Sequence, residues 1–471
     1  MKKTIIMGSG PAGLAAGYYL TKKGQPSLLL EAESQVGGIS KTIKYKDFYF
    51  DLGGHRFFTK FDEVNELWNE VLGDKFRKTP RLSRIYYRNK FFNYPLTAMN
   101  ALFGVGIKDT FIILFSYFKA RVFPYKKEET FEEWVSNRFG KKLYSIFFKT
   151  YTEKVWGIPC STIQAEWAAQ RIKGLSLTTA IINALFKPKK TNIKTLIDEF
   201  DYPEFGPGMM YTEMKNKIEK MKGEVRLNSY VTRINCDGYT VKSIEYTTSD
   251  GVKHVEEGSD FISTIPVTEL INSMYPKAPD DVLKAADNLK YRSFLTVDLI
   301  LNKKDLFPDN WIYIHSPEVK LGRIQNFKNW SKSMVPDEGK TSLGLEYFCN
   351  ENDELWNMED QKLFELAAKE VEMIKICKAS DILDYKVVRV PKAYPVYMMG
   401  YKDSLAKVEE YLRNFTNLHL AGRYGLFKYN NMDHSIMTGL YAAKNIAEGK
   451  KLYDTWSINT DDDYHEIKKE Q

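Results

Sequence analysis

The sequence predicts an α/β protein whose nucleotide-binding sheet is assembled from separate stretches of chain. One apolar run leads into Gly8-Ser9-Gly10-Pro11-Ala12-Gly13, and a second apolar run ends in Glu31. Short strand-like runs return far downstream, at 261–265 and 418–420, while the chain between is first helical in period and then alternating. These patterns predict a Rossmann-like domain in three discontinuous segments, with an inserted helical subdomain and an antiparallel-sheet substrate domain.

The expected boundaries follow the changes of period along the chain. We expect the following division: 1–95, 203–268 and 386–455 as the nucleotide-binding domain, 96–202 as the helical subdomain, 269–385 as the sheet domain for substrate, and 456–471 as a solvated tail.

The first glycine cluster predicts a strand, a tight turn and a helix N-terminus that face a pyrophosphate. Gly8 permits the turn, Gly10 lets the backbone approach the phosphates, and Gly13 lets the helix pack on the strand. Pro11 and Ala12 begin the helix, and Glu31 stands about 20 residues downstream, where a carboxylate binds the adenosine ribose. This order of glycines, strands and acid predicts a bound dinucleotide.

A second glycine cluster selects FAD over NAD. Gly37 and Gly38, with Ser40, are followed by Gly53-Gly54-His55. This second cluster resembles that of FAD-dependent amine oxidases and their relatives, whereas a plain dehydrogenase has no need of it. The nucleotide-binding domain is therefore predicted to be an FAD-binding domain.

The helical subdomain begins after residue 95. Its most apolar stretch, 101–120, contains Lys108, Asp109 and Lys119 and is too interrupted to span a bilayer. We expect a helix packed in the core in preference to one docked on a membrane. Further on, Thr130 and Glu133 have the spacing of a capping box at a helix start.

The remaining elements are predicted from local period and turn residues. In chain order we expect a helix from 206–208 to about 222, a strand at 224–234, a buried strand at 261–266, strands such as 295–300, a helix at 360–376, a strand and turn at 418–423, and a helix at 434–448. The last helix would direct its positive N-terminal end at the flavin, where negative charge gathers on reduction.

Composition bounds the function. The 471 residues, 43% of them apolar, are enough for a large core, and 68 basic against 61 acidic residues leave a net charge of +7. The sequence contains no clustered basic patch, so we do not expect a nucleic-acid partner. The modest positive charge fits an anionic small substrate or a membrane surface better. The four cysteines are far apart, which predicts neither a metal site nor a disulfide framework. With no room for a signal peptide before the first strand, we expect a cytoplasmic protein without a membrane span.

A series of motifs resembles UDP-galactopyranose mutases, most closely those of the long eukaryotic type, in register from residue 3 to about 448. The motifs are Phe131-Glu132-Glu133-Trp134, Lys154-Val155-Trp156-Gly157-Ile158-Pro159, Trp167-Ala168-Ala169-Gln170-Arg171-Ile172, Trp311-Ile312-Tyr313, Arg323 with Asn329-Trp330-Ser331, Ala393-Tyr394-Pro395, and Gly422-Arg423-Tyr424-Gly425-Leu426-Phe427-Lys428-Tyr429.

The resemblance implies a site for a nucleotide sugar. Arg171 and Arg323 would flank its pyrophosphate, and Tyr394 and Tyr429 would donate hydrogen bonds to it, since guanidinium groups and phenols suit a diphosphate that leaves. Other residues with an implied substrate-binding role are Tyr94, which would stack on uracil, Trp167, Trp311 and Tyr313, which share one strand face, and Asn431.

The resemblance also implies cofactor contacts. His55 would face the flavin edge and share a proton there, and Arg423 would meet the flavin. Val231 would offer its backbone to the adenine, and either Arg81 or Arg84 would lie near the flavin. The remaining cofactor-binding residues implied are Gly422, Asp433, His434 and Ser435.

The implied reaction is the interconversion of pyranose and furanose rings of a UDP-sugar through a sugar adduct at flavin N5, with FAD active in its reduced form. NADPH or NADH stays open as reductant, as do a homo-oligomer and the identity of the sugar. Leu96-Thr97 departs from the aromatic and amide pair of the family, so the base is assigned less firmly than the diphosphate. The alternative is an oxidoreductase of the amine oxidase or protoporphyrinogen oxidase type, which shares the glycine clamp and consumes oxygen or quinone.

Overall fold

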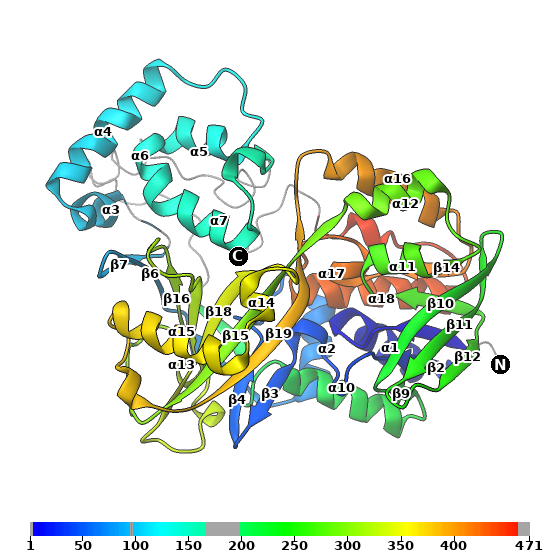
Figure 1. Cartoon of the computed structure of the whole chain (residues 1–471). Coiled ribbons are helices and arrows are strands. Elements are labelled where there is room, and N and C mark those ends of the chain that lie inside the picture. The colour runs from blue at the N-terminus through cyan, green and yellow to red at the C-terminus, as the bar shows by residue number, and fades with distance from the viewer. Residues whose placement is uncertain (1–2, 95, 97, 166–197, 460–471) are drawn as a thin grey trace.

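The computed structural model describes residues 3–94, 96, 98–165 and 198–459 (Figure 1). Within them the chain forms an α/β structure with three principal sheets, as the sequence predicts. Helices α3 to α7 form a separate group at one end of the molecule.

A five-stranded parallel sheet forms the centre of the nucleotide-binding part. Its order is β20 (Leu418–Leu420), β13 (Asp260–Ser263), β1 (Thr4–Met7), β2 (Ser27–Leu30) and β9 (Glu224–Arg226). β1, β2, β13 and β20 are buried on both faces, which explains why they are mostly apolar runs in the sequence, whereas the edge strand β9 is partly exposed. The three separate stretches of chain predicted from the apolar runs therefore do meet in one sheet.

Two different layers cover this sheet. One face packs against α1 (Pro11–Lys22), α2 (Asp62–Leu72), α10 (Gly208–Lys220) and α18 (Met432–Glu448). The other packs against a four-stranded sheet of order β12 (Lys253–Glu257), β11 (Thr240–Thr248), β10 (Ser229–Asp237) and β14 (Met274–Tyr275), together with α11 (Val267–Ser273), α12 (Asp280–Asn288) and α16 (Tyr401–Arg413).

A seven-stranded mixed sheet forms the second large layer. Its order is β19 (Ile382–Val396), β15 (Lys290–Leu301), β18 (Thr341–Cys349), β17 (Arg323–Asn326), β16 (Trp311–Ile314), β6 (Ser83–Tyr87) and β7 (Lys90–Asn93). Only the β16–β6 pair is parallel among the described pairings of this sheet. Helix α15 (Asp360–Met373) packs against its core.

Sheet pairing distributes some strands differently from the expected segments. The β6–β7 hairpin lies within 1–95 and β19 extends past 386, yet all three strands belong to the seven-stranded sheet. Conversely, β14 and α12 lie within 269–385 but pack with the four-stranded sheet.

The helical group contains α3 (Ala98–Val105), α4 (Ile107–Val122), α5 (Phe131–Phe139), α6 (Lys141–Tyr144) and α7 (Thr150–Trp156). The predicted capping box is confirmed: Thr130 accepts from the backbone of Glu133, whose carboxylate accepts from the backbone of Thr130. Smaller elements complete the described chain: β3 (Thr42–Tyr45) pairs with β4 (Phe48–Asp51), β5 (Phe76–Pro80) pairs with β8 (Glu199–Pro203), and α13 (Phe327–Trp330), α14 (Glu354–Asn357) and α17 (Gly422–Gly425) are single turns.

Two expectations were wrong. The apolar stretch at 101–120 was expected to pack in the core, but most of the large apolar side chains of α4 are exposed and Ile113 is its buried residue. The tail was expected to be solvated from residue 456, but Ile458 is buried and the side-chain amide of Asn459 donates to the carbonyl of Tyr429. Local sequence pattern could not predict either outcome, because burial of these two segments depends on which distant parts of the chain they pack against. No helix of the described chain is long and apolar enough to cross a membrane.

Candidate functional site

The turn after β1 has the backbone that the glycine motif predicts. Gly8 has φ +95°, and a Cβ there would lie 2.4 Å from Thr264 Oγ1. A Cβ on Gly13 would lie 2.0 Å from the carbonyl oxygen of Gly8, so helix and strand meet without room for a methyl group. This close packing fixes where α1 begins.

The N-terminus of α1 is open for an anion. Gly10 is its N-cap, and no side chain caps the helix there. The two glycine clusters meet at this point, because a Cβ on Gly38 would lie 3.4 Å from the Gly10 Cα, and the Gly37 N–H donates to the Ser9 carbonyl. Ser40 is buried in the same turn. Uncovered N–H groups between backbones without side chains fit the pyrophosphate of FAD.

Glu31 follows β2 at the carboxyl end of the sheet. Its Oε2 accepts from the backbone and hydroxyl of Ser9, at 2.8 and 3.0 Å, and Oε1 accepts from the Glu33 N–H at 3.1 Å. Burial raises the pKa of Glu31, and the two hydrogen bonds from Ser9 oppose this shift. The carboxylate braces the glycine turn at the position expected of the acid that binds the ribose.

The last return of the chain brings α18 against α1. Gly422 follows β20, and its backbone N–H donates a hydrogen bond to Thr438 Oγ1 at 2.9 Å. A Cβ on Gly422 would lie 3.1 Å from the Ala12 Cβ. Asn431 is the N-cap of α18 and forms a capping box with His434. The side chain that the resemblance directs toward substrate is thus engaged at the helix end. Asp433, His434 and Ser435 are buried in the first turn, and Val231 is buried in β10.

His55 is only partly accessible and lies close to two guanidinium groups. Burial lowers its pKa to about 3, with Arg423 and Arg323 adding to the shift and the backbone of Gly53 opposing it. The imidazole is therefore neutral at physiological pH. Within the described residues its buried Nδ1 has no hydrogen-bond partner.

Arg323 is held by a carboxylate that the sequence did not reveal. It stands directly opposite Glu346 across the β17–β18 pair, and its Nε donates to Glu346 Oε1 at 2.8 Å. Glu346 is fully buried and also accepts from Gln325 at 2.7 Å. A Cβ on Gly53 would lie 3.4 Å from Arg323 Nη2, which places this ion pair against the second glycine cluster.

Two tyrosines and an arginine form the opposite wall. The rings of Tyr394 and Tyr429 stack at 5.7 Å with an interplanar angle of 13°, and Trp156 contacts both. The Arg423 guanidinium lies over them, 4.8 Å from the Tyr429 centroid, and donates to the carbonyls of Asn430 and Ala393. Burial raises the pKa of Tyr394 and the charges of Arg323 and Arg423 oppose this shift, so the phenol stays protonated with both cations in its vicinity.

Aromatic side chains from three elements form a third wall. Tyr94 and Tyr313 are in contact at 4.7 Å, and Trp311 meets Tyr313 edge to face, which confirms that the two β16 residues share a face. Tyr151 of α7 packs on Tyr313 and stacks on His315. Burial raises the pKa of the Tyr151 phenol, and the positive charge of Arg323 partly opposes this shift. Tyr151 is therefore within electrostatic range of the ion pair between Arg323 and Glu346.

The geometry distinguishes Arg81 from Arg84. Arg81 lies 5.4 Å from the Trp311 ring and 5.6 Å from that of Tyr94, and its Nε and Nη2 are buried without a hydrogen-bond partner in the described chain. Arg84 is bound to the buried Asp309 by two hydrogen bonds, at 2.8 and 2.6 Å. Arg81 therefore lies with the aromatic side chains of the candidate site, whereas Arg84 forms a structural ion pair with Asp309.

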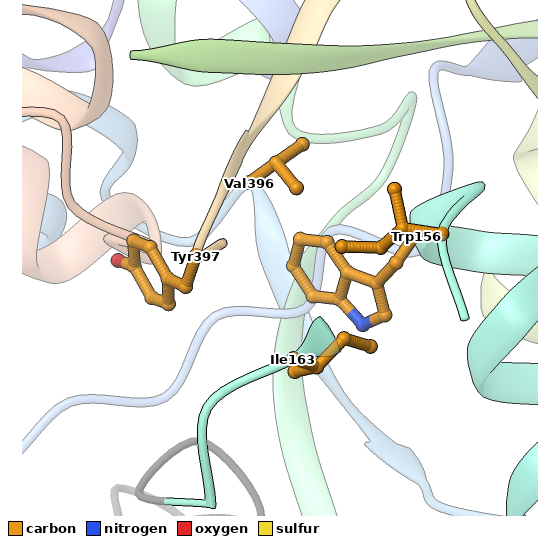
Figure 2. A pocket seen from close by; sticks show the side chains of 5 residues that line it. Trp156, Ile163, Val396 and Tyr397 are labelled. Carbon is orange, nitrogen blue, oxygen red and sulfur yellow. The ribbon is translucent and has the colours of Figure 1, made fainter. Parts of the chain in front are cut away.

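Figure 2 shows a shallow apolar hollow beside Trp156. It is lined by Trp156, Ile158, Ile163, Val396 and Tyr397. Tyr397 accepts the N–H of Tyr429 at 2.7 Å, so this junction of α7 with the end of β19 supports the tyrosine wall.

Sequence reasoning found some of this cluster and missed the rest. Trp167 and Arg171 lie outside the described residues. Three side chains were missed: Tyr151, Glu346 and Trp156 in its contact with the tyrosine pair. An acid on an apolar strand was a usable signal for Glu346, because a buried carboxylate requires a partner.

A parallel sheet with an open, glycine-bounded helix N-terminus, joined to a second sheet that carries a polar cluster, is the arrangement of FAD-dependent oxidoreductases. The chain belongs to the flavin-containing amine oxidoreductase family, whose model matches residues 11–447. Membership implies FAD as the cofactor.

Individual relatives differ in how much of the chain their match covers. The L-amino-acid oxidase of Crotalus adamanteus is 43% identical over 65 residues, a match that spans 14% of this chain and only 13% of that relative's length. The L-amino-acid oxidase of Demansia vestigiata is 21% identical over 94% of this chain and 86% of its own.

Solved structures share the whole fold. Reduced UDP-galactopyranose mutase superposes with a TM-score of 0.83 at 23% identity, covering 97% of this chain and 98% of the other. A putative protoporphyrinogen oxidase from Exiguobacterium sp. 255-15 gives 0.71 at 19% identity, covering 95% and 99%. At these identities the likeness establishes the fold.

Proposed function

We propose that this protein is a flavin-dependent nucleotide-sugar mutase that interconverts the pyranose and furanose forms of a UDP-sugar. The observation that carries the proposal is that two cations, Arg323 and Arg423, lie near the protonated phenol of Tyr394. An amine oxidase is expected to surround the reacting carbon with an apolar cage, whereas two cations beside a protonated phenol suit a diphosphate that takes on negative charge as it leaves.

The ion pair with Glu346 leaves Arg323 able to bind an anion. The carboxylate engages Nε and Nη2, so Nη1 retains its donors, and the plane of the guanidinium is fixed before substrate arrives. Arg423 is held only by backbone carbonyls in the described chain and keeps its full positive charge.

The aromatic wall supplies a place for the base and sugar. Tyr94, Tyr313 and Trp311 offer π-faces, and Arg81 adds a cation whose buried donors have no partner in the described chain. Stacking on such faces tolerates different bases, so the choice of uridine depends on contacts beyond these rings.

His55 contributes a neutral hydrogen-bonding group. Its pKa of about 3 disfavours the charged imidazolium, so Nδ1 accepts a hydrogen bond at the flavin edge without taking the proton. The glycine turn at the start of α1 would hold the pyrophosphate of FAD, and the reduced cofactor would supply the nucleophile for the anomeric carbon of the sugar. No protein carboxylate is needed as a base, in keeping with Glu346 being committed to Arg323.

The proposal is tested by titrating UDP into the FAD-loaded protein, with flavin fluorescence as readout, in the oxidised and the dithionite-reduced states. Tighter binding to the reduced protein, together with conversion of UDP-galactopyranose or a related UDP-sugar without net oxygen consumption, supports the mutase. No response to UDP in either state refutes it.

A matched pair of variants assigns the effect to Arg323. Arg323→Lys keeps a cation for Glu346 but loses the guanidinium fork, and UDP binding should weaken by about tenfold or more while FAD stays bound. Arg77→Lys, at an exposed arginine of β5, should bind UDP like the wild type.

The family and the amino-acid oxidase relatives favour a second candidate, an FAD-dependent oxidoreductase. It predicts steady oxygen or quinone consumption with an amine, amino acid or porphyrinogen and no dependence on UDP. Oxygen uptake with a panel of such substrates separates the two functions directly.

A further inference from the structure

Helix α4 turns its apolar side away from the protein. Figure 1 shows it at the outer edge of the helical group. The exposed fractions of Phe111, Phe115 and Phe118 are 69%, 72% and 68%. These residues belong to a single stripe at helical spacing, which we call the α4 face: Ile107, Phe111, Leu114, Phe115, Phe118 and Val122. Soluble monomers rarely expose a contiguous apolar surface of this kind.

The polar side of α4 faces inward. Asp109 lies 3.0 Å from Lys142 and 3.3 Å from Arg88, and the backbone N–H of Lys142 donates to Ser116. The orientation of α4 is therefore fixed by polar contacts, and its exposed phenylalanines are not the result of a helix left without neighbours.

Positive charge borders the α4 face. Lys108, Lys119 and Arg121 lie on the helix and Lys126 follows it, and all four are exposed. They form no ion pair within the described part of the chain. Asp109 is the only acidic residue in 107–126, and it is already neutralised on the inner side. An apolar stripe bordered only by cations is the pattern of a helix that lies in the interface of an anionic membrane.

We propose that the α4 face docks this protein on an anionic lipid surface, with α4 lying in the plane of the interface. A second copy of the chain is the poorer occupant, because an isologous contact would bring Lys119 and Arg121 against cations of the same helix with no carboxylate to offset them. A lipid surface offers hydrocarbon for the phenylalanines and negative head groups for the cations at once.

Co-sedimentation of the FAD-loaded protein with vesicles tests the proposal. The wild type should bind vesicles of phosphatidylcholine with phosphatidylserine and bind phosphatidylcholine alone more weakly. The triple variant Phe111→Ser/Phe115→Ser/Phe118→Ser should lose binding to both, since each buried phenylalanine contributes about tenfold to partitioning. The double variant Lys119→Glu/Arg121→Glu should lose the preference for the anionic vesicles, by about fivefold or more per charge.

Matched controls stand elsewhere on the surface. Val252→Ser/Val255→Ser/Leu452→Ser removes three exposed apolar side chains, and Lys253→Glu reverses an exposed cation. Both should bind vesicles as the wild type does. Equal binding by the wild type and the triple phenylalanine variant overturns the proposal. A sedimentation coefficient that falls in that triple variant without lipid also overturns it, because the α4 face then belongs to a second copy.

Discussion

Arg323 and Glu346 face each other across two antiparallel strands, with the carboxylate fully buried and the guanidinium bound at both Nε and Nη2. Tyr313 pairs with Arg323 from the next strand, so tyrosine, arginine and glutamate stand in one row across β16, β17 and β18. This strand register places the Arg323 guanidinium against Gly53, where a Cβ would lie 3.4 Å from Nη2.

Removing the carboxylate should destabilise the fold. Glu346→Ala leaves the buried Arg323 charge unpaired, and we expect the free energy of unfolding to fall by about 3–5 kcal/mol. Urea titration monitored by circular dichroism measures the change. Glu354→Ala, at an exposed ion pair with Lys320, should change it by less than about 1 kcal/mol. Equal losses in the two variants would show that the buried pair has no special weight.

Gly10→Ala separates cofactor binding from folding. The nearest described atom to a Cβ at Gly10 is the Gly38 Cα at 3.9 Å, so the methyl group fits the protein but enters the space assigned to the pyrophosphate. We expect unchanged stability of the FAD-free protein and FAD affinity reduced by about tenfold or more. Gly13→Ala is the contrasting variant, because its Cβ clashes with Gly8 and should destabilise the FAD-free protein too. Normal FAD binding by Gly10→Ala would place the pyrophosphate elsewhere.

Arg81 should contribute to anion binding although it contacts no carboxylate that the structure describes. Arg81→Ala should weaken UDP binding to the reduced protein by about tenfold, the effect of losing one charge-assisted hydrogen bond. Arg77→Ala, exposed on β5, should leave the dissociation constant unchanged. Isothermal titration measures both, and identical constants for the two variants would remove Arg81 from the site.

The buried histidine His315 should make stability depend on pH. Burial lowers its pKa to about 3, with Lys154 adding to the shift, whereas an unfolded histidine titrates near 6.5. Between these values the unfolded chain binds the extra proton, so this stabilising contribution is complete above about pH 6.5 and is lost as pH falls toward 3.

The measurement is the free energy of unfolding at several pH values for the wild type and His315→Gln. Between about pH 3 and 6.5 the free energy of unfolding of the variant should change less steeply with pH than that of the wild type, by up to about 1.4 kcal/mol per pH unit. Comparison within the pair is needed because burial raises the pKa of Asp51 to about 7, which favours the folded state on acidification. The exposed His254→Gln should keep the wild-type slope, and an unchanged slope in His315→Gln would contradict the assignment.

Local patterns were sufficient for the elements whose cause is local. The Gly8 to Gly13 turn, the Thr130 capping box and the helix that begins at Asp360 follow from neighbouring residues, and the structure contains all three. Burial of α4 could not be predicted in this way. Its apolar stripe has the same period whether it faces a core or the solvent, and the direction depends on Asp109 reaching Lys142 and Arg88.

By itself the sequence determined the parallel nucleotide-binding sheet, the glycine-bounded helix start and hence the flavin, because turn geometry and strand burial constrain the residues at each position. Only the tertiary structure paired Arg323 with Glu346, chose Arg81 over Arg84, and brought Tyr151 and Tyr394 beside one guanidinium. These relations depend on strand register and on the packing of segments far apart in the chain, and a change of register by one residue would turn each side chain to the opposite face.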